Sequence, residues 1–365
     1  MSKLRIGVVG GGVIGLACAW RLAGDGHQVL VFDGAPEARE ASWAAAGMLA
    51  PHHEAMAADA VWRLGTASLA RWPTFAAALG VEIDLHLNGG LLPLIDASDE
   101  AHLRDKIAFV TGHGIKARHL DVAELARLDP HVRARGALLL PGGHVDPRRL
   151  TAALRRGCEQ RGVDLRYGTA VTDVDTGGIR TTNGSERCDL TVLANGAWTP
   201  ELASLAGIAL AGEPVKGQMV RFAVGDGLLR HFIHCHHAYL VPRAGAGVVV
   251  GSTMVSSDFD KSEDAAAIAQ LTAQARRLLP ALDDAPVVET WTGLRPRVGA
   301  GVPVLQRVRE DVILATGHFR NGILLTPITA DAVAELAGGA GCDVALKDYR
   351  IAGDTVLGGA STPGQ

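Results

Sequence analysis

The hydrophobic pattern at the start of the chain predicts a strand, a helix and a second strand. A first apolar run covers residues 4–9, and a second one ends at Asp33. Between them stands the turn Gly10-x-Gly12-x-x-Gly15, whose glycines permit a sharp bend, close approach of a pyrophosphate, and tight packing of helix on strand. Because a helix N-terminus offers N–H groups to phosphates, this unit predicts a dinucleotide-binding site. The alternative is a structural glycine turn in an unrelated α/β unit.

The end of the second strand narrows the choice of dinucleotide. Asp33 follows Gly15 by 18 residues, where a carboxylate can accept both ribose hydroxyls and disfavours a 2′-phosphate. FAD or NAD therefore fits better than NADP. NAD enzymes usually continue with another strand and helix, but this chain continues with small residues over 40–51. Such a segment either lets the backbone approach a flat ligand or forms an alanine-rich helix, and both interpretations remain open.

Further along the chain, helical spacing and strand-like apolar runs follow one another. Apolar spacing and capping residues predict helices near residues 52–80, 98–113, 121–129, 147–161, 262–280 and 326–338. Apolar runs predict strands near residues 81–95, 163–167, 188–194 and 311–316, and Asn-Gly predicts a hairpin around 182–185. The strand 188–194 ends in a glycine turn at Gly196, at the kind of carboxyl edge where open α/β sheets bind ligands.

The distribution of these patterns predicts two domains. Residues 213–255 are β-rich, whereas nucleotide-type strands lie at the start, the middle and the end of the chain. The dinucleotide-binding domain must therefore be discontinuous, and we expect the site between it and the second domain. The expected limits are 1–51, 144–212 and 290–350 for the first domain, 52–143 and 213–289 for the substrate domain, and 352–365 for a disordered tail.

Composition and charge exclude several classes of protein. With 365 residues, of which 48% are hydrophobic and 20% charged, the chain is long enough for two domains with an ample core. Its net charge of −4 gives no reason to expect nucleic acid. No stretch approaches the roughly 18 uninterrupted apolar residues of a membrane span. Three consecutive glycines interrupt the one segment that resembles a signal peptide.

The cysteines and histidines predict neither a disulfide framework nor a metal site. The five cysteines are scattered, odd in number and without CxxC spacing, which favours a reducing, cytoplasmic setting. The 14 histidines show no HExxH or similar ligand spacing.

Six segments of the chain occur together in a known family. They are GGGVIG with Asp33, SWAAAGML, GHVDP, the run Tyr239-x-Val241-Pro242-Arg243, GLRPR and ATGHFRNGILLTP. In these segments, over residues 4 to about 340, the chain resembles the D-amino acid oxidase-like flavoenzymes, and within them the ThiO-type glycine oxidases. The resemblance implies an α/β fold with a Rossmann-type, glutathione-reductase-like FAD-binding domain and an α+β substrate domain on an antiparallel sheet. It also implies noncovalent FAD, oxidation of small amines and a link to thiamin thiazole synthesis.

Carried over residue by residue, the resemblance implies the contacts to the cofactor. Together with the motif residues Gly10, Gly12, Gly15 and Gly196, the residues expected at FAD are Val13, Ile14, Asp33, Gly34, Ala41, Ser42, Ala46, Gly47, Met48, Val171 and the loop His318, Phe319, Arg320, Asn321, Gly322, Ile323 and Leu324. Asp33 stands where the family usually has Glu, and Ala41 where a hydroxyl residue could sit. No cysteine lies between residues 236 and 341, so a cysteinyl-flavin link has no candidate near the matching loop.

The resemblance also implies where a substrate would lie. The residues expected around it are Arg295, Arg320, Met48, His237, Tyr239 and Met254. A planar guanidinium binds the carboxylate of a small amino acid bidentately, and the alternative for Arg295 is a solvated surface arginine. Tyr239 could hydrogen-bond the same carboxylate or simply pack in its strand. His237 belongs to a His-rich segment, residues 231–237, whose role the sequence does not indicate.

None of these residues is an obvious general base, and none is required if the neutral amine binds, because the cofactor carries the hard chemistry. The leading hypothesis is oxidation of glycine and related small amines, such as sarcosine and small D-amino acids, with reduction of oxygen to hydrogen peroxide. The imine could pass to a thiazole synthase, and we expect a homo-oligomer. The alternatives are a D-amino acid dehydrogenase that passes electrons to a membrane quinone, and a flavin-binding interaction protein without turnover.

Overall fold

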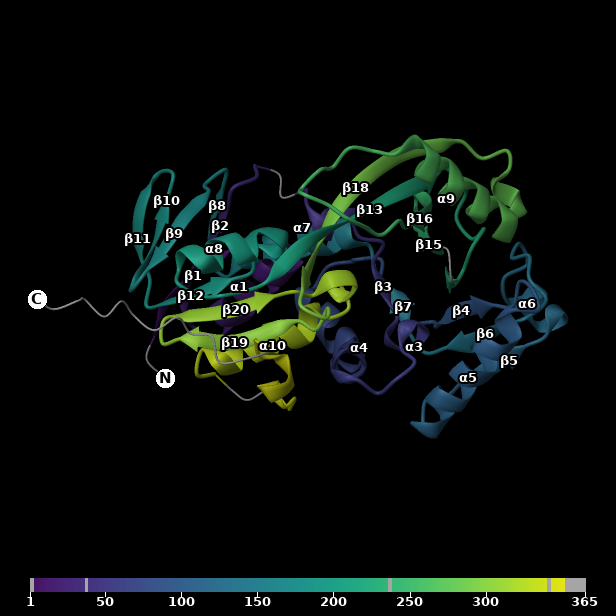
Figure 1. Cartoon of the computed structure of the whole chain (residues 1–365), viewed down its shortest axis with the longest axis horizontal. Helices are drawn as coiled ribbons and strands as arrows, with labels where there is room; N and C mark the ends of the chain where they lie inside the picture. The colour runs from purple at the N-terminus through teal and green to yellow at the C-terminus, as the bar shows by residue number, and fades with distance from the viewer. Residues whose placement is uncertain (1–2, 37–38, 236–237, 340–342, 352–365) are drawn as a thin grey trace, which may run out of the picture.

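Two sheets of different character organise the molecule (Figure 1). The structure is a computed structural model that describes residues 3–36, 39–235, 238–339 and 343–351. The predicted tail, residues 352–365, lies outside the described residues. Within them, none of the helices is both long and apolar enough to cross a membrane.

The first sheet has six strands and carries the dinucleotide motif. In spatial order they are β19 (Val304–Arg309), β20 (Val312–Thr316), β12 (Leu190–Leu193), β1 (Arg5–Val9), β2 (Gln28–Asp33) and β8 (Asp164–Tyr167). All neighbours are parallel except β19 and β20. Three helices cover one face, α1 (Val13–Gly24), α7 (Pro147–Gln160) and α10 (Thr326–Leu336), and α4 (Ala60–Leu79) packs against α10 in the same core. Because parallel strands are buried on both faces, they appear in the sequence as continuous apolar runs.

The other face of this sheet is covered by a small antiparallel layer and a short helix. The layer consists of β9 (Val171–Asp175), β10 (Gly178–Thr181) and β11 (Gly184–Arg187), and the helix is α8 (Thr199–Leu205). Phe32, Ile179 and Leu202 are buried together in the core between them. The strand β12 therefore lies inside the sheet, and its carboxyl end runs into the 3-10 helix η1 (Gly196–Trp198).

The second sheet has nine strands and is almost entirely antiparallel. Its order is β17 (Val255–Ser256), β13 (Gly212–Phe222), β16 (Gly247–Gly251), β15 (Tyr239–Arg243), β14 (Phe232–His234), β4 (Gly90–Pro93), β6 (Ala137–Leu140) and β5 (Arg118–Leu120), with β18 (Val287–Val298) also paired to β13. One pair, β14 with β4, is parallel. Three helices accompany the sheet: α5 (Asp99–Gly112), α6 (Val122–Leu128) and α9 (Ala265–Leu278).

Short elements connect the two sheets at the middle of the molecule (Figure 1). They are the helices α2 (Ala41–Ala44) and α3 (Pro51–Glu54) and the two-stranded pair β3 (Met48–Leu49) and β7 (Gly143–His144). The remaining 3-10 turns are η2 (Pro280–Leu282), η3 (Phe319–Asn321) and η4 (Leu346–Tyr349). The alanine-rich segment is thus a single helical turn followed by extended backbone, which combines the two interpretations of its sequence.

Local sequence signals account for most of these elements. Asp146 caps α7 by accepting the N–H of Arg148 at 2.8 Å, and Pro147 is its first residue. Of the strand-like pieces expected near 81–95, β4 forms a strand, and His86 makes an isolated bridge to His144. The predicted helix 52–80 is interrupted, because α3 and α4 are separate. The hairpin of β10 and β11 forms, with Thr181 opposite Gly184.

The division into two domains remains a prediction, and we propose to move two of its limits. Residue 290 lies inside β18, which pairs with β13 along its length. A limit near residue 299 would leave that sheet whole. The helix α4 was assigned to the substrate domain, but its buried Leu64 and Trp72 share one core with Leu16 of α1. We therefore group α4 with the six-stranded sheet.

Candidate functional site

A cavity of about 780 Å³ lies between the two sheets. The residues predicted from sequence that line it are Gly10, Gly12, Val13, Ile14, Asp33, Gly34, Ala41, Ser42, Ala46, Gly47, Met48, Val171, Gly196, Tyr239, Arg295, His318, Phe319, Arg320, Asn321, Gly322 and Ile323. They come from both sheets and from the short elements between them. We call the part formed by the glycine turn and Asp33 the nucleotide end, and the part formed by Arg295, Arg320 and Tyr239 the substrate end.

The nucleotide end is built from backbone at the carboxyl edge of the first sheet. Gly10 has φ +111°, and a Cβ there would lie 2.4 Å from the Ala194 carbonyl oxygen. Gly15 does not line the cavity. Its role is steric, since a Cβ at Gly15 would lie 1.8 Å from the Gly10 carbonyl oxygen. Gly12, the N-cap residue of α1, has no side chain to cap the helix itself. The start of this helix therefore faces the cavity as an anion-binding end.

Asp33 and Ser42 complete this end. The Asp33 carboxylate accepts the N–H of Gly11 at 2.7 Å and that of Ala35 at 2.8 Å. Burial raises the pKa of Asp33, and these two N–H groups oppose the rise. Ser42 Oγ accepts the N–H of Val13 at 3.0 Å. The Asp33 carboxylate at the end of β2 and the Ser42 hydroxyl thus hold in place the backbone that a dinucleotide would contact.

The loop after β20 forms another wall and is fixed from behind by α4. His318 Nε2 lies 2.9 Å from Thr329 Oγ1, and burial lowers the pKa of His318 to about 3. Leu324 does not line the cavity. Its carbonyl oxygen instead accepts hydrogen bonds from Ser68 Oγ at 2.6 Å and Trp72 Nε1 at 3.0 Å. Two side chains of α4 therefore hold the carboxyl end of the loop. The local sequence of α4 does not predict this contact.

Arg295 lies at the substrate end, on β18. Its Nη1 donates to the Thr253 carbonyl oxygen at 3.2 Å, and its Nη2 donates to Ser252 Oγ. The guanidinium lies against Gly217 of β13, where a Cβ would come within 2.2 Å of it. Glycine at that position is thus what allows the guanidinium to lie flat on the strand. A guanidinium held in this way can receive a carboxylate in the cavity.

Arg320 is paired with an acid that the sequence analysis missed. Its Nη2 donates to Glu54 Oε1 at 2.7 Å, and His234 Nε2 lies 3.6 Å from the same oxygen. Burial alone would raise the pKa of Glu54, but the hydrogen bond to His234 and the charge of Arg320 outweigh it and lower that pKa to about 2. With this lowered pKa, Glu54 is an ionised carboxylate in the wall of the cavity.

A buried lysine supports the short helix that carries Glu54. Lys106 of α5 is fully buried and donates to the carbonyl oxygens of His52, at 3.3 Å, and Ala55. These carbonyls lie at the end of α3, where a cation is favourable. Burial lowers the pKa of Lys106 to about 8. The only sequence signal for Glu54 was its place after Pro51 in the connection between the two sheets.

The remaining predicted substrate residues differ in their placement. Tyr239 lines the cavity, and its hydroxyl donates to Met219 Sδ at 3.4 Å. Met254 does not line the cavity, and its side chain is 58% exposed. His237 lies outside the described residues. Among the residues that are described, no group of three His, Cys, Asp or Glu side chains is placed to hold a metal ion.

The groups that line the cavity fit a bound dinucleotide. Asn195, next to Gly196, is half-buried at the cavity wall, and its buried Oδ1 finds no partner among the described residues. A buried oxygen of this kind indicates a ligand or water that would satisfy it. With the N-terminus of α1 and the Asp33 carboxylate, the fold and the site define a Rossmann-type dinucleotide-binding protein whose second sheet completes an active-site cavity.

Comparison with known proteins identifies the family. Residues 5–336 match the family model described as FAD dependent oxidoreductase. A glycine oxidase of Geobacillus kaustophilus is 33% identical over 92% of this chain and 93% of its own length. The crystal structure of glycine oxidase from the same organism covers 96% of this chain and 98% of its own chain, with a TM-score of 0.90 at 30% identity. The chain belongs to the FAD-dependent oxidoreductase family, and FAD is its cofactor.

A longer relative adds a second observation. The protein named bifunctional protein ThiO/ThiG of Synechocystis is 33% identical over 90% of this chain, and the match spans 51% of that relative. About half of the relative thus corresponds to this chain.

The expected α/β fold with a parallel and an antiparallel sheet is confirmed, with the parallel pair of β14 and β4 as the exception within the second sheet.

Proposed function

We propose that the protein oxidises glycine and related small amines, including sarcosine and small D-amino acids, to the imine and then the oxo acid, with reduction of oxygen to hydrogen peroxide. The observation that carries this proposal is Arg295, a guanidinium held by two neighbouring groups in the wall of an FAD cavity. The similarity to glycine oxidases over nearly the whole chain supports the same substrate class.

The residues of the substrate end divide the recognition of a small amino acid between two charges. Arg295 binds the substrate carboxylate bidentately, which fixes its orientation as well as its charge. The Glu54 carboxylate lines the same cavity and favours a substrate with a cationic or hydrogen-bonding amine. Tyr239 adds a hydroxyl that can turn from Met219 to the substrate carboxylate.

No residue of this set is required to act as a base. A carboxylate with a pKa of about 2, such as Glu54, accepts protons weakly near neutral pH. The substrate amine therefore loses its proton to water before oxidation. Turnover then rises with pH through the range in which this amine deprotonates. When bound, FAD supplies the acceptor for the hydride from the substrate α-carbon. The protein's residues orient that carbon and leave the chemistry to the cofactor.

A spectrum of the purified protein tests the proposal. Glycine added without oxygen should bleach the visible flavin absorption, and readmitted air should restore it with formation of hydrogen peroxide. Reduction without peroxide formation, together with transfer to a quinone, would indicate a dehydrogenase instead. A spectrum that glycine leaves unchanged would indicate a flavin-binding protein without this activity.

The attachment of the cofactor and the fate of the product belong to the same proposal. We expect noncovalent FAD, so acid precipitation should release all the colour into the supernatant, and a yellow pellet would contradict this.

The name of the ThiO/ThiG relative supports delivery of the imine to a thiazole synthase. We further propose a cytoplasmic homo-oligomer, which sedimentation of the holoenzyme would test.

A further inference from the structure

We propose that Arg243, a buried arginine of the second sheet, is a positioning residue that sets the backbone of residues 46–48 against the flavin. It lies outside the cavity lining and contacts neither end of the site. The proposal depends on FAD as the cofactor and not on the identity of the substrate. It can therefore fail or hold independently of the proposed function.

The segment that Arg243 holds is short and depends on a glycine. Ala46, Gly47 and Met48 all line the cavity. Gly47 has φ +82°, a backbone conformation that side chains rarely adopt, and a Cβ there would lie 2.0 Å from the Val145 carbonyl oxygen. Beyond it, β3 and β7 pair over only two residues each. Strand pairing of this length gives little stability on its own.

Arg243 closes the open end of this short ladder. At that end the N–H of Val145 donates to the Gly47 carbonyl oxygen at 3.0 Å. Arg243 Nη1 donates to the Val145 carbonyl oxygen at 3.0 Å, and Nη2 donates to the Ala46 carbonyl oxygen. One planar guanidinium thus joins the two chains just past their last pair. The Ala46 carbonyl is thus engaged by a residue that lies outside the cavity lining.

The charge of Arg243 is costly to bury, which argues against a role in packing alone. The residue is only 6% exposed, and burial lowers the pKa of Arg243 to about 10, against the opposing charges of Asp146 and Asp84. Burying a charge costs free energy unless hydrogen bonds and opposite charges compensate it, so an arginine is a poor choice where only space has to be filled. A flexible apolar residue could fill this space but could not orient two carbonyl groups.

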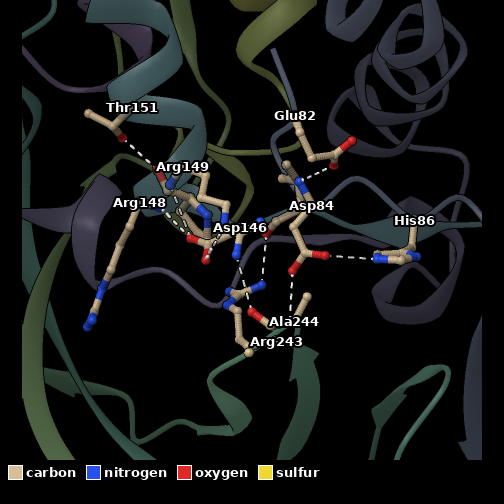
Figure 2. A network of polar contacts seen from close by, with 12 residues as sticks. Glu82, Asp84, His86, Asp146, Arg148, Arg149, Thr151, Arg243 and Ala244 are labelled. Atoms are coloured by element: carbon tan, nitrogen blue, oxygen red, sulfur yellow. Dashed lines mark hydrogen bonds and ion pairs between the residues drawn. The ribbon is translucent and has the colours of Figure 1, made fainter. Parts of the chain in front are cut away.

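The neighbouring acids do not form directed bonds that would take over this role. Figure 2 shows Arg243 below Asp146 and beside Asp84. The Asp146 carboxylate accepts the N–H groups at the start of α7, at 2.8 and 3.2 Å. The Asp84 carboxylate accepts the N–H of Ala244 at 3.1 Å and lies 2.9 Å from His86 Nε2. The acids favour the charge from nearby, while the hydrogen bonds of the guanidinium go to the two carbonyls.

The test compares Arg243→Met and Arg243→Lys with a matched control, Arg149→Met. Arg149 belongs to the same network and donates to the Ala244 carbonyl oxygen at 3.3 Å, but it is exposed and does not line the cavity (Figure 2). Three quantities are measured without substrate: the dissociation constant of FAD, the visible spectrum of bound FAD, and its reduction potential. A residue that merely stabilises the fold would leave the spectrum and the reduction potential of FAD unchanged once FAD is saturating.

We expect Arg243→Met to weaken FAD binding roughly ten- to a hundredfold, the range for loss of hydrogen bonds to a charged group. The spectrum and the potential of the FAD that still binds should shift. Arg243→Lys should recover part of the affinity, because an ammonium keeps the charge but lacks the planar fork. Arg149→Met should match the wild type in all three quantities.

The proposal is overturned if Arg243→Met lowers only the unfolding temperature and leaves the affinity, spectrum and potential of FAD at their wild-type values. If Arg243→Met fails to fold, Arg243→Lys decides alone. A shifted spectrum and potential in the folded lysine variant would support the positioning role, and wild-type values would refute it.

Discussion

The two ends of the cavity are constructed in different ways. The nucleotide end is a continuous stretch of backbone, in which Gly10 and Gly15 matter because a Cβ would collide with a carbonyl oxygen. The substrate end is assembled from charged side chains of distant segments. Arg295 of β18 is held by Ser252 and Thr253. Arg320 of the loop after β20 is held by Glu54 of α3.

This difference separates steric from electrostatic function. At the nucleotide end, adding a methyl group should be enough to remove the cofactor, because the backbone itself is the binding surface. At the substrate end, the backbone tolerates change, but each charge depends on the groups that hold it. Substitutions at the two ends should therefore affect different quantities: cofactor content at one and the Michaelis constant for substrate at the other.

The largest effect is expected for Gly15→Ala. The added Cβ would lie 1.8 Å from the Gly10 carbonyl oxygen, so the turn and the start of α1 cannot keep their positions. The purified variant should carry no FAD, as measured by its visible absorption relative to protein. Gly112→Ala is the matched control, since a Cβ there meets no atom within 4 Å. A yellow Gly15→Ala protein with normal FAD affinity would break the steric side of the comparison.

The next effect is expected for Arg295→Ala. Loss of a charge-assisted bidentate contact costs about 1.5–3 kcal/mol, so the Michaelis constant for glycine should rise roughly ten- to a hundredfold. The FAD content should stay normal. Arg297→Ala serves as the control, because Arg297 lies on the same strand but pairs with Glu213 at 2.8 Å and does not line the cavity. Equal Michaelis constants for both variants would remove the anchor role of Arg295.

Acid should lower the stability of the protein through a buried neutral histidine near each end of the cavity. Burial lowers the pKa of His318 at the nucleotide end, and that of His53 behind the substrate end, to about 3 in each case. The unfolded protein binds these protons below its ordinary pKa of about 6.5, so stability is present above that pH and is lost as the pH falls.

At pH 5, each of these histidines should lower the free energy of unfolding by roughly 2 kcal/mol relative to pH 7. Urea unfolding at the two pH values measures the loss. His53→Phe, beside the ring of Phe232 at 4.7 Å, should lose less stability over this range than the wild type. A wild-type protein equally stable at pH 5 and pH 7 would contradict the prediction.

The smallest effect is expected for Tyr239→Phe. A positioning hydrogen bond contributes about 0.5–1.5 kcal/mol, so turnover of glycine should slow roughly two- to tenfold. General-base loss would instead cost about a hundredfold or more. His237→Ala should likewise retain substantial activity. If either variant binds FAD and glycine but no longer reduces the flavin, that residue is the proton acceptor, and the absence of a protein base is refuted.

The sequence predicted the nucleotide end well because its signals are local. The glycine turn, the apolar strands on either side of it and Asp33 lie within 30 residues of one another and form one folding unit. The caps of α7 and the last parallel strand were equally local. The antiparallel sheet was predicted in outline only, because its pairings, such as β14 with β4, join segments far apart in the chain.

The substrate end was harder to predict because its residues depend on tertiary partners. Glu54 carries no motif, and only the fold brings it to Arg320, 266 residues away in the sequence. Lys106 appears in the sequence as an ordinary helical lysine, yet it is fully buried at the end of α3. Met254 was expected beside the substrate, but a mostly exposed side chain outside the cavity lining does not support that role.

The most direct measurement of the central claim is a titration of the oxidised holoenzyme with acetate, a carboxylate that carries no amine to oxidise. Binding in the cavity should shift the visible spectrum of the flavin. The wild type and Arg297→Ala should show the same saturable shift, and Arg295→Ala should need roughly ten- to a hundredfold more acetate. Equal dissociation constants in all three proteins, each with full FAD content, would show that Arg295 does not hold the carboxylate.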